Sequence, residues 1–228
     1  MYALLEGGFP KGAHVISRSM HEAAVVASVL CEFGTTPGHE DLGLRFLSFD
    51  HMTNLMDAEE HQRHAERLGY EPFSDEEMAA LRATKAEVLE RFPDLDAPLG
   101  WAGSLPGLKK RDFRGLEALA RLDHLRPYYT WASHEVHAYP KGVRLNQSGL
   151  DGRQWKLAGR TNAGLADPAQ SALIALNQVT ASMLTLPGVP SPSRLVASQA
   201  AMILQNEACH EFVRIEDEIA AEHSVTVV

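Results

Sequence analysis

Polar side chains at helical spacing near the middle of the sequence are the residues best suited to chemistry. They are Arg126, Tyr129, Ser133 and His137, at intervals of three, four and four residues, which place side chains on one face of a helix. The imidazole of His137 is a natural proton carrier near neutral pH, and Ser133 could act as a nucleophile. No Gly-x-Ser-x-Gly motif surrounds Ser133, however, and its hydroxyl could instead bond a backbone carbonyl four residues back. The stripe is either a functional site or a buried hydrogen-bond network.

A second polar pair, Arg18 and Glu22, lies one helical turn apart in the most apolar helical segment of the chain. Charges among Val, Ile and Ala are costly to bury unless they bond each other or another group. The pair therefore either fixes the register of its helix or faces the polar stripe. His21 points elsewhere on this helix, and we interpret it as a surface histidine or one with a satisfied partner.

Metal and phosphate motifs are weak or missing, although the chain has 11 histidines. His134 and His137 are three residues apart, one short of the zincin His-Glu-x-x-His spacing, and His61 and His64 sit among charged residues typical of a solvated surface. There is no Walker loop and no Gly-x-Gly-x-x-Gly motif; Arg160, in a polar loop, could bind an anion. We predict no metal and no cofactor.

Composition narrows the class of protein. A net charge of −9 does not indicate nucleic-acid binding. Cys31 and Cys209 lie far apart in apolar helical contexts, which predicts unpaired, buried thiols in a reducing compartment. No signal peptide opens the chain, and its longest apolar run is too short to span a membrane. We expect a cytoplasmic protein without a membrane partner.

The elements that must position these residues are helical. The hydrophobic pattern predicts an all-α bundle of about seven helices, over residues 14–33, 39–68, 74–92, 111–125, 127–139, 167–186 and 193–222. A capping box at Ser74 and a stop at Gly69 mark two boundaries. Loop insertions are expected at residues 93–110 and at 141–166, the latter irregular or holding a hairpin of residues 143–145 and 154–157. We predict a single domain, 1–228, with its core in 10–222.

Several segments resemble one bacterial family. They are Arg18-Ser-Met-His-Glu22, Arg45-Phe46, Tyr129-x-x-x-Ser133-x-x-Val136-His137-Ala138, and Asp167-Pro-Ala with the helix that follows. Over roughly residues 10–185 the chain is similar to the domain-of-unknown-function family numbered 5677. The resemblance implies an all-helical fold without an established activity. Its matched positions, our candidate catalytic residues, are Arg18, Glu22, Tyr129, Ser133 and His137.

A weaker likeness concerns the helical ribonucleases of the HEPN class, in which an Arg precedes a His by a short interval. In those enzymes the pair acts on the RNA 2′-hydroxyl and phosphate. Seven residues separate Arg126 from His134 and ten separate it from His137, and neither spacing fits. Arg18, on another helix, could take the place of Arg126.

Three functional hypotheses remain, and whether the chain is an enzyme is left open. The first is a ligand-binding or regulatory module in which these five candidate residues bind a small polar ligand or only stabilise the fold. The second is a metal-independent ribonuclease or phage-defence effector, with His137 as acid or base and Arg18 or Arg126 on the phosphate. The third is a metal-dependent hydrolase using His134, His137 and carboxylates from other helices. The expected partner is a small polar ligand or a phosphate-bearing substrate, and a homodimer is an open alternative.

Overall fold

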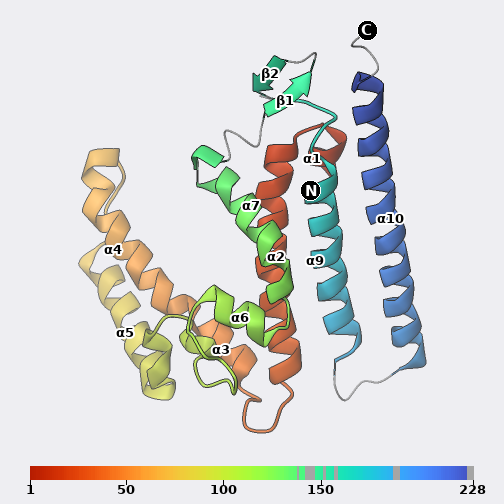
Figure 1. The fold of residues 1–228 in the computed structure, drawn as a ribbon. Coiled ribbons are helices and arrows are strands. Elements are labelled where there is room, and N and C mark those ends of the chain that lie inside the picture. The colour runs from red at the N-terminus through yellow and green to blue at the C-terminus, as the bar shows by residue number, and fades with distance from the viewer. Residues whose placement is uncertain (138, 142–146, 151–152, 157–158, 187–190, 225–228) are drawn as a thin grey trace. The chain divides into compact units, whose positions relative to one another are not determined.

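The fold is all-α, as predicted (Figure 1). A computed structural model describes residues 1–137, 139–141, 147–150, 153–156, 159–186 and 191–224. The chain forms two compact units, Met1–Cys31 with Ala120–Val228, and Glu32–Leu119. The single domain 1–228 stays a prediction.

The first unit carries the polar stripe and the Arg18–Glu22 pair. Its elements are α1 (Tyr2–Glu6), α2 (Pro10–Phe33, whose last two residues belong to the second unit), the 3-10 turn η3 (Asp123–Leu125), α7 (Arg126–Val136), β1 (Gln147–Leu150), β2 (Arg153–Lys156), α9 (Ala166–Leu184) and α10 (Pro192–Ser224). Helix α9 packs along α10 and also contacts α7 (Figure 1). Side-chain hydrogen bonds from Tyr129 of α7 to Arg18 and Glu22 of α2 join these two helices.

Small side chains are prominent among the buried residues of α2 and α9. Buried residues of α2 include Ala13, Ala24 and Val25, and those of α9 include Ala169 and Ala172. Each buried side chain adds hydrophobic stabilisation. The helix begins at Pro10 rather than at the predicted residue 14, which agrees with the preference of proline for the first turn.

Two side-chain hydrogen bonds tie α2 to α9. The hydroxyls of Ser28 and Ser182 lie 3.1 Å apart, and Gln178 Nε2 donates to the Ser28 hydroxyl at 3.5 Å. These bonds satisfy the hydroxyl of Ser28, which is buried and would otherwise cost free energy. They fix how α9 lies on the helix that carries Arg18.

The second unit contains α3 (Leu42–Ser48), α4 (Asp50–Leu68), α5 (Asp75–Arg91), the 3-10 turns η1 (Pro93–Asp96) and η2 (Gly100–Ala102), and α6 (Phe113–Leu119). Leu95, Trp101 and Leu116 are among its buried residues. Arg45 is buried too and donates to Asp94 at 2.6 Å, which holds the pKa of that carboxyl below its ordinary value. Arg45, part of a family-like segment, therefore stabilises this unit.

The predicted helix boundaries are partly correct. The capping box at Ser74 and the left-handed stop at Gly69 are confirmed. The helix expected over 39–68 is wrong, because it is divided at Phe49 into α3 and α4. The helix expected over 111–125 is wrong as well, because Arg121 adopts a φ of 60°, which ends the helical path after α6. Neither break carries a glycine or proline, so no local signal marked it.

The hairpin expected in the insertion is present, with a different first strand. Strands β1 and β2 pair antiparallel, with Gln147 opposite Lys156. Strand β2 overlaps the predicted 154–157, whereas the predicted strand 143–145 lies outside the described residues. No helix that the structure describes is long and apolar enough to cross a membrane.

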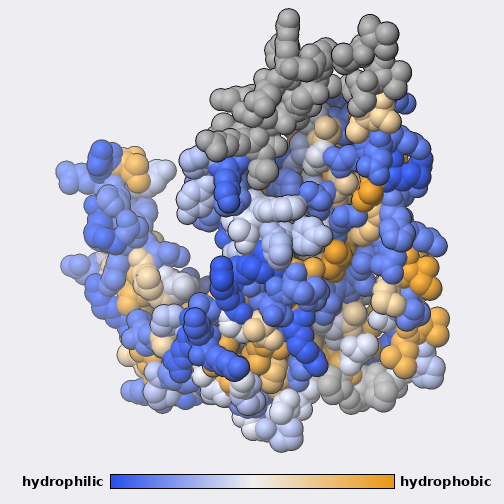
Figure 2. Space-filling view, in the orientation of Figure 1, coloured by the Kyte–Doolittle hydropathy of each residue, from blue (hydrophilic) through white to orange (hydrophobic). Residues whose placement is uncertain are grey.

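The solvent side of α10 is unusually apolar. Figure 2 shows hydrophobic residues along its N-terminal half, and the exposed ones include Leu195, Val196, Met202, Ile203 and Leu204. Exposed apolar patches often mark interaction surfaces. The homodimer considered from the sequence stays a prediction.

Candidate functional site

Tyr129 connects α7 to α2 at the centre of the candidate site. Its hydroxyl donates to Glu22 Oε1 at 2.9 Å and accepts from Arg18 Nη2 at 2.8 Å. The same Nη2 lies 3.1 Å from Glu22 Oε1, so the three groups form a closed triangle. The Arg18–Glu22 pair therefore faces the polar stripe, and its one-turn spacing lets both side chains reach the same phenol.

His137 lies at the exposed edge of this triangle. It follows the last residue of α7, where its backbone N–H donates to the carbonyl of Ser133 at 3.1 Å. Its Nε2 is 3.4 Å from Arg18 Nη1. Because a guanidinium can only donate, Nε2 is the acceptor in this weak contact. We call Arg18, Glu22, Tyr129 and His137 the polar cluster.

Ser133 is on the same helix face but has a local role. Its hydroxyl donates to the backbone carbonyl of Tyr129 at 2.7 Å, one of the two alternatives that its spacing allowed. The hydroxyl proton is therefore committed to the helix backbone. Ser133 therefore lies beside the polar cluster but does not donate its hydroxyl proton to the cluster's side chains.

Two guanidinium groups lie against the ring of Tyr129. The Cζ atoms of Arg18 and Arg126 are 4.8 and 4.7 Å from the ring centroid, within the range of cation–π attraction. Burial raises the pKa of Tyr129 above its ordinary value, Glu22 raises it further, and Arg18 opposes the change. The phenol thus keeps its proton at neutral pH and acts as a donor to Glu22.

Two neighbours of the cluster were not predicted from the sequence. His21 is buried, and its ring centroid is 5.8 Å from that of Tyr129, so placing it away from the site was wrong. Its position three residues after Arg18 was a signal for a shared face. Tyr139 contacts the rings of His134 and His137; it follows the end of α7, so helical spacing could not place it.

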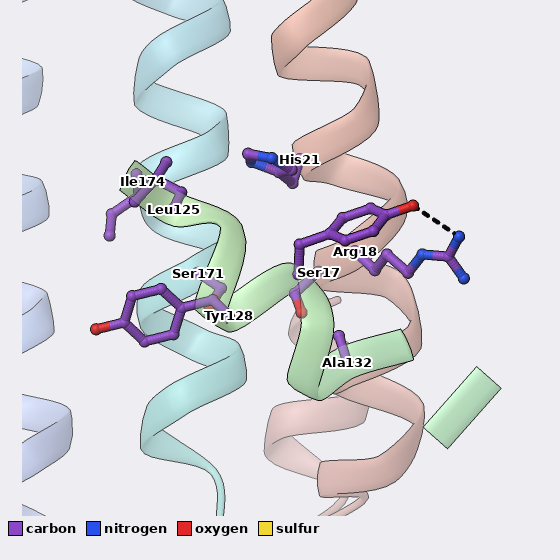
Figure 3. A pocket seen from close by; sticks show the side chains of 9 residues that line it. Ser17, Arg18, His21, Leu125, Tyr128, Ala132, Ser171 and Ile174 are labelled. Atoms are coloured by element: carbon purple, nitrogen blue, oxygen red, sulfur yellow. Dashed lines mark hydrogen bonds between the residues drawn. The ribbon is translucent and has the colours of Figure 1, made fainter. Parts of the chain in front are cut away.

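A small pocket lies beside the cluster, between α2, α7 and α9, and we call this the inner side of the cluster (Figure 3). Its volume is about 20 Å³, and its lining includes Ser17, His21, Ser171 and Ile174. That is room for about one water molecule. In Figure 3 Arg18 and Tyr128 extend in opposite directions, with Arg18 toward its hydrogen bond. A larger ligand of the cluster would have to bind on the outer side, where His137 is exposed.

The remaining candidate residues contribute less. Among the residues that the structure describes, no three His, Cys, Asp or Glu side chains are grouped so as to hold a metal ion. Arg160, considered as an anion ligand, donates its Nε–H to the backbone carbonyl of Gly7 at 2.8 Å. This bond ties the loop before α9 to the segment between α1 and α2.

Comparison with known proteins places the chain in a family. The family of unknown function DUF5677 matches residues 1–153. The chain belongs to this family. All four residues of the polar cluster lie in the part that matches DUF5677, as does Ser133. The Asp167-Pro-Ala segment, which also resembled the family, lies beyond the matched residues. No curated protein and no solved structure matches the chain.

Proposed function

We propose that this protein is a cytoplasmic helical module that binds a small polar ligand on the outer side of its polar cluster. One feature of the cluster carries the proposal: Arg18, Glu22 and Tyr129 bond one another, while Glu22 and His137 also meet solvent. The side chain of Arg18 is only 18% exposed, that of Glu22 is 40% exposed, and His137 is exposed. The free thiols of Cys31 and Cys209 support the cytoplasmic location.

The chemistry of the cluster favours a ligand without net charge. Arg18 and Glu22 carry opposite charges 3.1 Å apart, so the site offers a donor beside an acceptor rather than a concentration of one charge. A ligand with an acceptor next to a donor could bond both groups. Because Tyr129 already holds Arg18 in place, little conformational entropy is lost when the ligand binds.

Ligand titration followed by NMR tests this proposal. The imidazole signals of His137 would be recorded with acetamide, inorganic phosphate, ribose 5-phosphate and uridine as probes. At least one probe should shift them in the wild type, and Glu22→Gln, which removes the charge and keeps the shape, should weaken that probe several-fold. Arg67→Gln, at an exposed arginine of α4, is the control. If no probe shifts the His137 signals, the proposal is wrong.

The ribonuclease is the second candidate, and the Arg18–His137 contact favours it. The HEPN class needs an Arg and a His, and the spacing from Arg126 to either histidine does not fit. Arg18 of α2 and the exposed His137 at the end of α7 supply such a pair, with Nη1 and Nε2 3.4 Å apart. In such a reaction His137 would take the proton of an RNA 2′-hydroxyl and Arg18 would bind the phosphate. The 2′-oxygen would bond to phosphorus, and the 5′-oxygen would leave with a proton from water. The products are a 2′,3′-cyclic phosphate and a 5′-hydroxyl.

RNA cleavage in the presence of a chelator separates this candidate from a binding module. We rank it second because Glu22 beside Arg18 and the net charge of −9 both oppose a polyanion. Cleavage by the wild type that is lost in His137→Ala, and absent on the matching DNA strand, would establish an enzyme. Equal cleavage by both proteins would point to a contaminant and leave the ribonuclease without support.

A further inference from the structure

Tyr139 presents an aromatic surface beside the polar cluster. Tyr139 is 53% exposed. Its ring centroid is 5.7 Å from that of His134 and 6.0 Å from that of His137, with interplanar angles of 83° and 63°. These are edge-to-face contacts, the arrangement that aromatic rings prefer. Two such contacts restrain the orientation of the ring while half of its surface stays open to solvent.

His137 connects this surface to the donor and acceptor groups. It contacts the ring of Tyr139 and, through Nε2, lies 3.4 Å from Arg18 Nη1. Arg18 in turn holds Glu22. The order along the site is therefore an aromatic face, an imidazole, a guanidinium and a carboxylate. A planar molecule could stack at one end and use hydrogen bonds at the other.

Nucleobases are planar molecules that can both stack and form hydrogen bonds along their edges. Every base has a π-face that stacks on an aromatic side chain, whatever its identity. Every base also carries acceptors and donors along its edges, to which guanidinium and carboxylate groups bond. The balanced charge of Arg18 and Glu22 suits a neutral base better than a phosphate group.

We propose that the ligand of the polar cluster is a nucleobase or nucleoside, stacked on Tyr139 with its edge toward Arg18 and Glu22. This inference rests on the proposed function and gives the chemical class of the ligand. The inner pocket takes no part, because about 20 Å³ is far too small for a base. The base binds on the outer side of the cluster, where Tyr139 and His137 are exposed.

Nucleoside titrations on Tyr139 variants test the inference. Uridine, cytidine, adenosine and guanosine would each be titrated against the full chain, with ribose and inorganic phosphate alongside, and followed at His137 by NMR. At least one nucleoside should bind more tightly than ribose or phosphate. Tyr139→Ala should weaken it about tenfold, the effect of removing one stacking contact, and Tyr139→Phe should retain it. Tyr70→Ala is the matched control, because Tyr70 is also an exposed tyrosine against a histidine ring, with its centroid 5.8 Å from that of His61.

The outcomes separate this inference from the proposed function. If nucleosides bind Tyr139→Ala as tightly as the wild type, or if ribose or phosphate binds as well as any nucleoside, the nucleobase inference is overturned and a polar-ligand site remains. If none of the compounds, acetamide included, shifts the His137 signals in the wild type, both fail. A loss of binding in Tyr139→Phe equal to that in Tyr139→Ala would also contradict stacking, because phenylalanine keeps the ring.

Discussion

The hydroxyl of Tyr129 is the atom on which the contact between α7 and α2 depends most. It accepts from Arg18 and donates to Glu22, so Tyr129→Phe leaves both charged partners with one bond fewer. We expect the substitution to lower the free energy of unfolding by about 1–3 kcal/mol, the usual cost of an unsatisfied partner. Urea denaturation followed by circular dichroism measures this change.

His137 should behave differently, although it belongs to the same cluster. Its side chain is exposed and its contact with Arg18 is long, so His137→Ala should change the free energy of unfolding by less than about 0.5 kcal/mol. The same denaturation experiment provides the comparison. A destabilisation as large as that of Tyr129→Phe would make His137 part of the architecture and remove the main reason to regard it as a site.

At the scale of elements, His14 makes the packing of α2 sensitive to pH. Burial lowers the pKa of His14 below its ordinary 6.5, and the carboxylates of Asp167, Glu135 and Glu216, from three other helices, oppose this only in part. Between this lowered pKa and pH 6.5 the unfolded chain therefore binds a proton that the folded chain does not. The stability contributed by neutral His14 is complete above 6.5 and is lost as the pH falls toward its lowered folded value.

This pH dependence gives a test with a matched control. The melting temperature should fall between pH 7.5 and pH 5.5, and His14→Gln should reduce that fall. His124→Gln makes the same replacement at an exposed histidine of the same unit. If both variants alter the pH dependence equally, the titration of His14 does not govern the stability of this helix.

At the scale of the whole molecule, the second unit has the features of an independent fold. It buries Leu95, Trp101 and Leu116 and contains the Arg45–Asp94 ion pair. Because these contacts lie within residues 32–119, we expect that fragment to keep its helical circular dichroism and to melt cooperatively. An unfolded fragment would instead favour the single domain predicted from the sequence.

A helix boundary can be predicted from the sequence only where a local residue type marks it. Ser74 and Gly69 mark boundaries through side-chain capping and a positive φ, so both could be recognised. The breaks at Phe49 and Arg121 could not, because neither residue type disfavours a helix strongly enough to mark a boundary. Arg121 adopts a left-handed φ of 60° against its local preference, whereas Phe49 keeps helical dihedral angles.

The hydrophobic pattern was enough to predict the all-α fold, and helical spacing was enough to predict that Arg18 lies beside Glu22 and Tyr129 in line with His137, because helix geometry fixes which side chains share a face. That these two pairs meet could not be predicted, since Arg18 and Tyr129 are 111 residues apart and their contact depends on how α2 and α7 pack. The same packing buried His21 against Tyr129, whereas the backbone bond of Ser133 needed nothing beyond its own helix.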